Sequence, residues 1–123
     1  MNHRSRADIL RDCFAAYRSR DRELLEDLLA DEFNFTSPYD DRIDKRSYFE
    51  RCWPNSLRIK EHILEKIFVE GDEAFVRYRC LTRDGKEFRN TEFFTFAGDK
   101  IVSVEVYFGA SYVEGRFVKA SVT

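Results

Sequence analysis

One acidic residue late in the chain stands among aromatic residues, in the stretch NTEFFTF of residues 90–96. This residue, Glu92, is a surface group, half of an ion pair, or a working acid in a cavity. A buried carboxyl group can transfer a proton or hold the polar end of a ligand. The side chains that face Glu92 on the neighbouring strands therefore decide what it can do.

The preceding strand is predicted to place arginines beside Glu92. If residues 84 and 85 form a two-residue turn, Arg77 lies opposite Glu92 and Arg79 lies opposite Asn90. Arginine favours the charged form of a carboxyl group, whereas an apolar cavity favours its protonated form. These four residues would form either the polar floor of a cavity or an ion-paired cluster on an exposed sheet face.

The following strand is predicted to place Glu92 on an apolar face. A two-residue loop after Ala97 would put Glu92 opposite Glu105, which sets two like charges against each other. A three-residue loop puts Glu92 opposite Val104, on the face that carries Val106. We therefore expect cross-strand contacts of residue 92 with residues 77 and 104.

Two more carboxylates, Asp40 and Asp41, follow Ser37 closely in the stretch SPYDD. In a loop at the mouth of a pocket, either one could act as a general base, with Glu92 as the acid or hydrogen-bond donor. The alternative is that they only shape a turn, where aspartate is common. Neither histidine has a second ligand at metal spacing, and there is no phosphate-binding glycine loop, so we expect no metal and no cofactor.

The elements that must position these side chains are helices in the first half of the chain and strands in the second. Ser5, Asp21 and Asp44 are predicted N-caps of three helices, of which the first spans 6–20 and the third ends at Pro54. A short strand ends at Pro38, and four further strands are predicted at 58–70, 73–83, 86–97 and 100–108. Helices in one block and strands in another predict an α+β fold, with one domain over residues 1–123.

The composition limits the classes of binding partner and the cellular location that we expect. The 123 residues carry a net charge of −2 with both signs interspersed, so nucleic acid is not an expected partner. No stretch approaches the ~18 apolar residues of a membrane span. The three cysteines are odd in number and far apart, which is typical of free thiols in a reducing compartment. We expect a cytoplasmic protein that does not bind membranes.

The order of the elements, with the stretches FTSP, CWPNSL and EFFTFAGDKIVSVEVYFG, resembles the nuclear transport factor 2 superfamily in its SnoaL-like and ketosteroid-isomerase-like branch. The resemblance covers essentially the whole chain. It implies a curved antiparallel meander sheet that forms a cone closed by three N-terminal helices. It also implies a mostly apolar pocket inside the cone and a homodimer through the sheet.

The resemblance carries over little of the chemistry of that branch. The general-base aspartate of ketosteroid isomerases falls on Ser37, their helix-1 tyrosine falls on Phe14, and only their hydrogen-bonding acid is kept, as Glu92. The aspartate of the limonene-epoxide-hydrolase branch falls on Val106. Ketosteroid isomerase activity is therefore not expected.

The first hypothesis is a domain that binds a small, mostly apolar molecule bearing a hydroxyl, carbonyl or carboxylate group. The alternatives are a cofactor-independent isomerase, cyclase or lyase acting on a hydrophobic carbonyl or hydroxyl compound, and a dimeric protein-interaction module. The aromatic residues among the candidates either line a pocket or fill the core. The residues predicted to bind the ligand are Phe14, Tyr17, Phe35, Ser37, Tyr39, Trp53, Arg77, Arg79, Asn90 and Val106.

Overall fold

The computed structural model describes residues 5–119. Ser5, Asp21 and Asp44 each accept the backbone N–H of the third residue after them, which confirms the three predicted N-caps. The third helix ends at Arg51, and Pro54 lies in the first turn of a following 3₁₀ helix. The helices are α1 (Arg6–Ser19), α2 (Arg22–Leu28), α3 (Lys45–Arg51) and the 3₁₀ helix η1 (Trp53–Leu57).

The strands form one mixed sheet in the order β2-β1-β6-β5-β4-β3, with β7 paired to β6. The predicted meander is present as β3 to β6, and β1 joins it by running parallel to β6. Residues 40–44, expected as a loop, form a strand that pairs with β1. The strands are β1 (Leu29–Ser37), β2 (Asp40–Asp44), β3 (Ile59–Glu70), β4 (Glu73–Thr82), β5 (Lys86–Ala97), β6 (Lys100–Val113) and β7 (Arg116–Val118).

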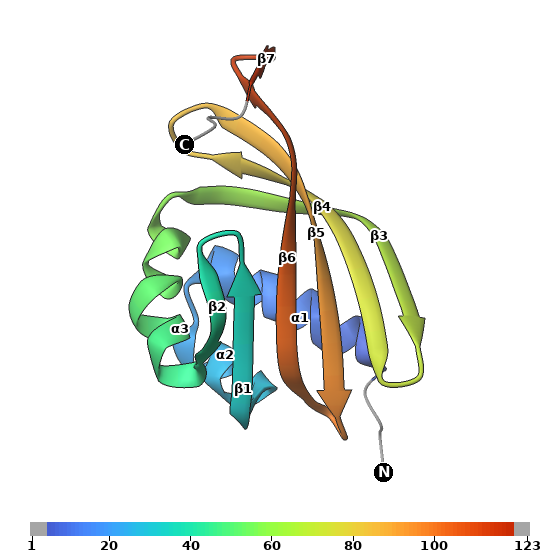
Figure 1. Ribbon diagram of the computed structural model, residues 1–123. Coiled ribbons are helices and arrows are strands. Elements are labelled where there is room, and N and C mark those ends of the chain that lie inside the picture. The colour runs from blue at the N-terminus through green and yellow to red at the C-terminus, as the bar shows by residue number, and fades with distance from the viewer. Residues whose placement is uncertain (1–4, 120–123) are drawn as a thin grey trace.

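The sheet curves around the helices, and α1 runs across one of its faces (Figure 1). We call the face toward α1 the inner face and the opposite one the outer face. Leu10 and Phe14 of α1 are buried together with Val76 and Phe94 of the sheet, so the core lies at the inner face. This arrangement confirms the expected α+β cone. Within residues 5–119, no helix has the length and apolar character needed to cross a membrane.

The turn between β4 and β5 differs from the prediction and shifts the strand register by one residue. Residues 83–85 form a three-residue loop, in which Gly85 takes a positive φ of 86°. The Thr82 hydroxyl group closes this loop by accepting the N–H of Lys86 and donating to its carbonyl oxygen. Glu92 therefore lies opposite Val76, and the predicted pairing with Arg77 is wrong.

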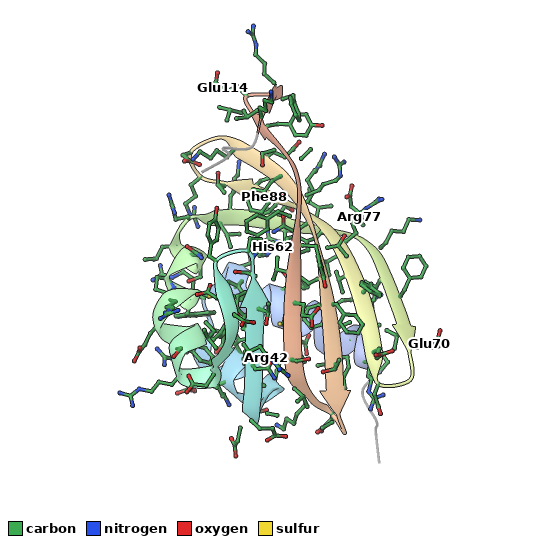
Figure 2. The ribbon with its side chains drawn as sticks, in the orientation of Figure 1. Arg42, His62, Glu70, Arg77, Phe88 and Glu114 are labelled. Atoms are coloured by element: carbon green, nitrogen blue, oxygen red, sulfur yellow. The ribbon has the colours of Figure 1, made fainter. Side chains whose placement is uncertain are left out.

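The register shift moves both predicted arginines to the outer face. Arg77 lies opposite Thr91, and Arg79 lies opposite Arg89. Successive side chains of a strand point to opposite faces, so a slip of one residue turns every side chain over. Figure 2 shows Arg77 well apart from His62, which belongs to the inner face. The arginines therefore do not form a polar floor with Glu92.

The turn between β5 and β6 also differs from the prediction. Ala97 pairs with Lys100 across a two-residue loop, and the register then shifts between Thr95 and Phe96. Glu92 consequently lies opposite Val106, so the predicted pairing with Val104 is wrong. The irregularity nevertheless keeps Glu92 on the inner face with both valines, which are buried.

Candidate functional site

A chain of three polar side chains occupies the centre of the inner face. The Tyr78 hydroxyl group donates a hydrogen bond to Oε2 of Glu92 over 2.5 Å and accepts one from Nδ2 of Asn90 over 3.2 Å. Tyr78 and Asn90 are buried, and Glu92 is partly buried. β4 supplies the tyrosine and β5 supplies the other two residues, because alternate positions of each strand point toward the helices. The sequence predicted Asn90 and Glu92 here but missed Tyr78.

The Glu92 carboxyl group is held in a neutral environment. Burial raises its pKa from 4.5 to about 7, and the hydrogen bond from Tyr78 offsets part of that rise. No ion pair found within residues 5–119 involves Glu92. Both protonation states are therefore populated near neutral pH, so the group can donate or accept a hydrogen bond and can give or take a proton.

Two tyrosines and a histidine lie on the helix side of Glu92. Tyr17 of α1 and Tyr48 of α3 are hydrogen-bonded through their hydroxyl groups, and burial raises the pKa of both well above 10. The His62 ring of β3 packs edge-on against Phe14 and Tyr78, with centroids 5.1 Å away in each case. Burial lowers the pKa of His62 to about 4, so the ring is neutral at neutral pH.

The negative charge of Glu92 influences the pKa of several other groups in this interior. It contributes to raising the pKa of the tyrosine pair and of the three cysteines, and burial is the larger cause in each case. These groups come from both helices and strands, so residues of the helical layer and of the inner face both lie within electrostatic range of Glu92. The groups are Cys13, Tyr17, Tyr48, Cys52 and Cys80.

Several predicted ligand-binding residues border this region. Phe14, Phe35 and Val106 are buried within the core cluster. Tyr17 and Trp53 are partly buried, with ring centroids 5.1 Å apart. The structure thus gathers these residues on the inner side of the sheet, as the sequence predicted.

The remaining candidates lie at the rim or outside. The Ser37 hydroxyl group donates to Asp40 over 3.3 Å, and Arg51 pairs with the same carboxylate over 3.1 Å. Asp41 is exposed. Tyr39 is 82% exposed and contacts the Phe108 ring, so it does not lie in the interior.

Two surface hollows of the described residues lie away from this region. One is lined by residues of α2 and β1, by Ala97 and Lys100 at the ends of β5 and β6, and by Lys45, and the other lies between α2 and α3. Neither is lined by Glu92 or His62. Residues 5–119 also contain no group of three histidine, cysteine or acidic residues placed to hold a metal ion.

Comparisons with known proteins agree with this architecture. A sequence model of the SnoaL-like domain matches residues 10–104. A search of curated proteins gives no match.

Solved structures with the same fold share little sequence with this chain. An NTF2-like protein of unknown function from Cytophaga hutchinsonii is 19% identical, with a TM-score of 0.72 over 87% of this chain and 92% of that one. A candidate ketosteroid isomerase from Kribbella flavida is 17% identical, with a TM-score of 0.74 over 87% and 79%. A candidate SnoaL-like polyketide cyclase from Jannaschia is 14% identical, with a TM-score of 0.73 over 88% and 91%.

Proposed function

Since the chain belongs to the SnoaL-like domain family, we propose that it binds a small, mostly apolar molecule between its helices and the inner face of its sheet. Glu92 holds the polar end of that molecule, with Tyr78 and Asn90 fixing the carboxyl group. The observation that carries the proposal is the buried Glu92 carboxyl group on the mostly apolar inner face, with no ion pair to any of residues 5–119. Burying a carboxyl group costs free energy of desolvation, and such groups with shifted pKa values cluster at binding and catalytic sites.

Aromatic and aliphatic side chains support the apolar part of the proposal. Phe14, Trp53 and Val106 border the region around Glu92 from α1, η1 and β6. Tyr17, Trp53, His62 and Glu92 keep part of their surface accessible although they belong to the interior layer. A mostly apolar site with few polar groups is the usual composition of a small-molecule site.

Binding of 2-naphthol tests the proposal, because this probe is an apolar ring system with one hydroxyl group and its own fluorescence. Glu92→Leu is expected to weaken binding about tenfold, which corresponds to about 1.4 kcal/mol, a typical value for a lost hydrogen bond. Glu65→Leu is the matched control, because Glu65 lies on the outer face. Equal affinities of the two variants, or no binding by the wild type, would contradict the proposal.

A proton-transfer function is the second candidate, and the pKa of about 7 at Glu92 favours it. A general acid or base works best when its pKa lies near the working pH. The protein would then be a cofactor-independent isomerase, cyclase or lyase, with Glu92 as the acid or base. Asp40 is a weaker partner, because Arg51 and Ser37 already hold its carboxylate.

Exchange of the acidic C–H hydrogens of 2-tetralone in deuterated water tests this second candidate by NMR. The wild type is expected to accelerate exchange, and Glu92→Gln is expected to abolish the acceleration. Asp40→Asn is expected to change it little. If Glu92→Gln exchanges the probe as fast as the wild type does, Glu92 is not the base.

The outer face supports the homodimer that the family resemblance implies. The rings of Phe75 and Phe93 pack with centroids 4.8 Å apart, and Phe75 and Phe68 remain 47% and 66% exposed. Exposed aromatic side chains on a sheet favour association. Sedimentation velocity is expected to show a dimer that Phe75→Glu converts to a monomer.

The three free cysteines are consistent with a protein that functions in a reducing cytoplasm.

A further inference from the structure

His62, Tyr17 and Tyr48 bring three polar groups together at the helix side of the interior. The His62 and Tyr17 rings are perpendicular, with centroids 6.2 Å apart, and the Tyr17 hydroxyl group is bonded to that of Tyr48. β3, α1 and α3 each supply one of these residues. Neither His62 nor Tyr48 stood out as a binding residue from the sequence.

The hydrogen bonds of this group are incomplete. Nδ1 of His62 is buried and has no hydrogen-bond partner among residues 5–119. The two tyrosine hydroxyl groups carry two hydrogens, and the bond between them uses only one. Within the described chain, neither hydroxyl group has a further partner. Buried polar atoms in native proteins are nearly always paired, so an unpaired set calls for a partner from outside the chain.

The missing partner is uncharged, accepts a hydrogen bond from the tyrosine pair, and either donates to or accepts from Nδ1 of His62. The tyrosine pair offers a hydrogen, and the neutral imidazole offers either a hydrogen or a lone pair at Nδ1, according to its tautomer. A hydroxyl group satisfies both in either tautomer. No arginine or lysine in residues 5–119 is among the groups that shift the pKa of Tyr17, Tyr48 or His62, so a carboxylate would be buried here without a counter-charge.

We propose that His62, with the Tyr17–Tyr48 pair, forms a second polar subsite that binds a hydroxyl group of the ligand. This inference rests on the proposed ligand-binding function and specifies the class of ligand. Tyr78 links the two subsites, because its ring contacts His62 while its hydroxyl group bonds Glu92. The ligand is therefore an apolar compound that carries two oxygen groups, one at Glu92 and a hydroxyl group at His62.

Affinity measurements with 2-naphthol and with 1,5-, 2,6- and 2,7-dihydroxynaphthalene test the second subsite. At least one diol is expected to bind the wild type about tenfold more tightly than 2-naphthol, the usual gain from one added hydrogen bond. His62→Phe keeps an aromatic ring at this position and is expected to remove that gain while 2-naphthol still binds. If no diol gains over 2-naphthol, or if His62→Phe keeps the gain, the second subsite is wrong although the proposed function stands. If no compound binds, both fail.

Nitrogen NMR of the wild type, labelled only at histidine, gives a second test that does not depend on the folding of a variant. The chain has two histidines, so the spectrum contains the ring signals of His62 and His3 alone. Saturation with the preferred diol is expected to shift the His62 Nδ1 signal, and 2,6-dimethylnaphthalene is expected to leave it in place. An equal response to both compounds would overturn the subsite.

Discussion

The two faces of the sheet treat the same side chain in opposite ways. On the inner face, burial raises the pKa of Glu92 to about 7. On the outer face, Glu65 accepts two hydrogen bonds from Arg89, at 2.9 and 3.2 Å, and lies 3.5 Å from Arg77. The hydrogen bonds from Arg89 are the main cause that lowers the pKa of Glu65. At neutral pH the Glu92 carboxyl group is therefore partly protonated, while the Glu65 carboxyl group is ionised.

The difference shows that local environment, and not residue type, assigns the role of a glutamate. The outer network of Glu65, Arg77, Arg89 and the Arg79–Glu87 pair solvates an exposed sheet. The inner face carries the hydroxyl, amide and imidazole groups of Tyr78, Asn90 and His62, and none of them compensates a full charge. An acid with a pKa near 7 can persist only on the inner face.

Glu92→Gln is expected to have the largest effect on the comparison. The pKa of Glu92 is about 7 in the folded protein and 4.5 for the ordinary group, so the contribution of this group to wild-type stability falls as pH rises from 4.5 to 7. At pH 8 the variant is expected to be about 3 kcal/mol more stable than the wild type, and at pH 4 the difference disappears. Urea unfolding at the two pH values measures this. A variant that is less stable at pH 8 would mean that Glu92 is ionised as readily as Glu65.

His62→Phe is expected to show the opposite dependence on pH. The pKa of His62 is about 4 in the fold against 6.5 for the ordinary group, so the contribution of this group to wild-type stability falls as pH decreases from 6.5 to 4. The variant is expected to gain about 2 kcal/mol relative to the wild type between pH 7 and pH 5. The same urea unfolding experiment reports it. If the difference between variant and wild type is constant over this range, the ring is not buried in its neutral form.

These two slopes oppose each other in the wild type. Between pH 4.5 and 6.5, the unfolded chain carries a proton on His62 that the fold lacks, while the fold carries a proton on Glu92 that the unfolded chain lacks. Their contributions to the slope of stability with pH therefore nearly cancel. Each single variant exposes the slope of the other group, so the pair serves as a reciprocal control.

Tyr78→Phe is expected to have an intermediate effect. The variant removes the hydrogen bond that lowers the pKa of Glu92, so that pKa should rise further above 7. It also leaves Nδ2 of Asn90 without its acceptor, at a cost of about 1–2 kcal/mol in stability. Carbon NMR of the Glu92 carboxyl group during a pH titration measures the shift. A lowered pKa would show that Tyr78 does not donate to the carboxylate.

Glu65→Gln is expected to have the smallest effect. Its partners Arg77 and Arg89 are 49% and 42% exposed, and water and salt screen such pairs. The melting temperature should fall slightly at low salt and match the wild type at high salt. Binding of 2-naphthol should not change. A loss of binding would remove the distinction between the two faces.

The strand register explains why the sequence predicted only part of the site. The Asp84-Gly85 pair is typical of a two-residue turn. Here the Thr82 hydroxyl group accepts the N–H of Lys86 and donates to its carbonyl oxygen, which closes a loop of three residues instead. Because the loop is one residue longer than predicted, the predicted face of Arg77 was wrong. For the same reason the sequence analysis missed Tyr78, which lies beside Glu92 where Arg77 was expected. The sequence left open whether Glu92 faces the interior or an exposed face, although it favoured the interior, and its predicted partner on β6 was wrong.

The amino-acid sequence by itself determined the helix caps, the family and the type of most elements, the strand at residues 40–44 excepted. Caps such as Ser5 and Asp44 depend on contacts within a few residues, and the alternation of exposed and buried side chains along strands such as β4 follows the sequence directly. The tertiary structure decided which side chains surround Glu92. His62, Tyr17 and Tyr48 meet because three elements pack together, and their unpaired hydrogen bonds arise only from that packing. Strand register and helix docking depend on contacts between residues far apart in the chain. The alternative pairings differ little in free energy, and a short stretch of sequence does not show which of them is the most stable.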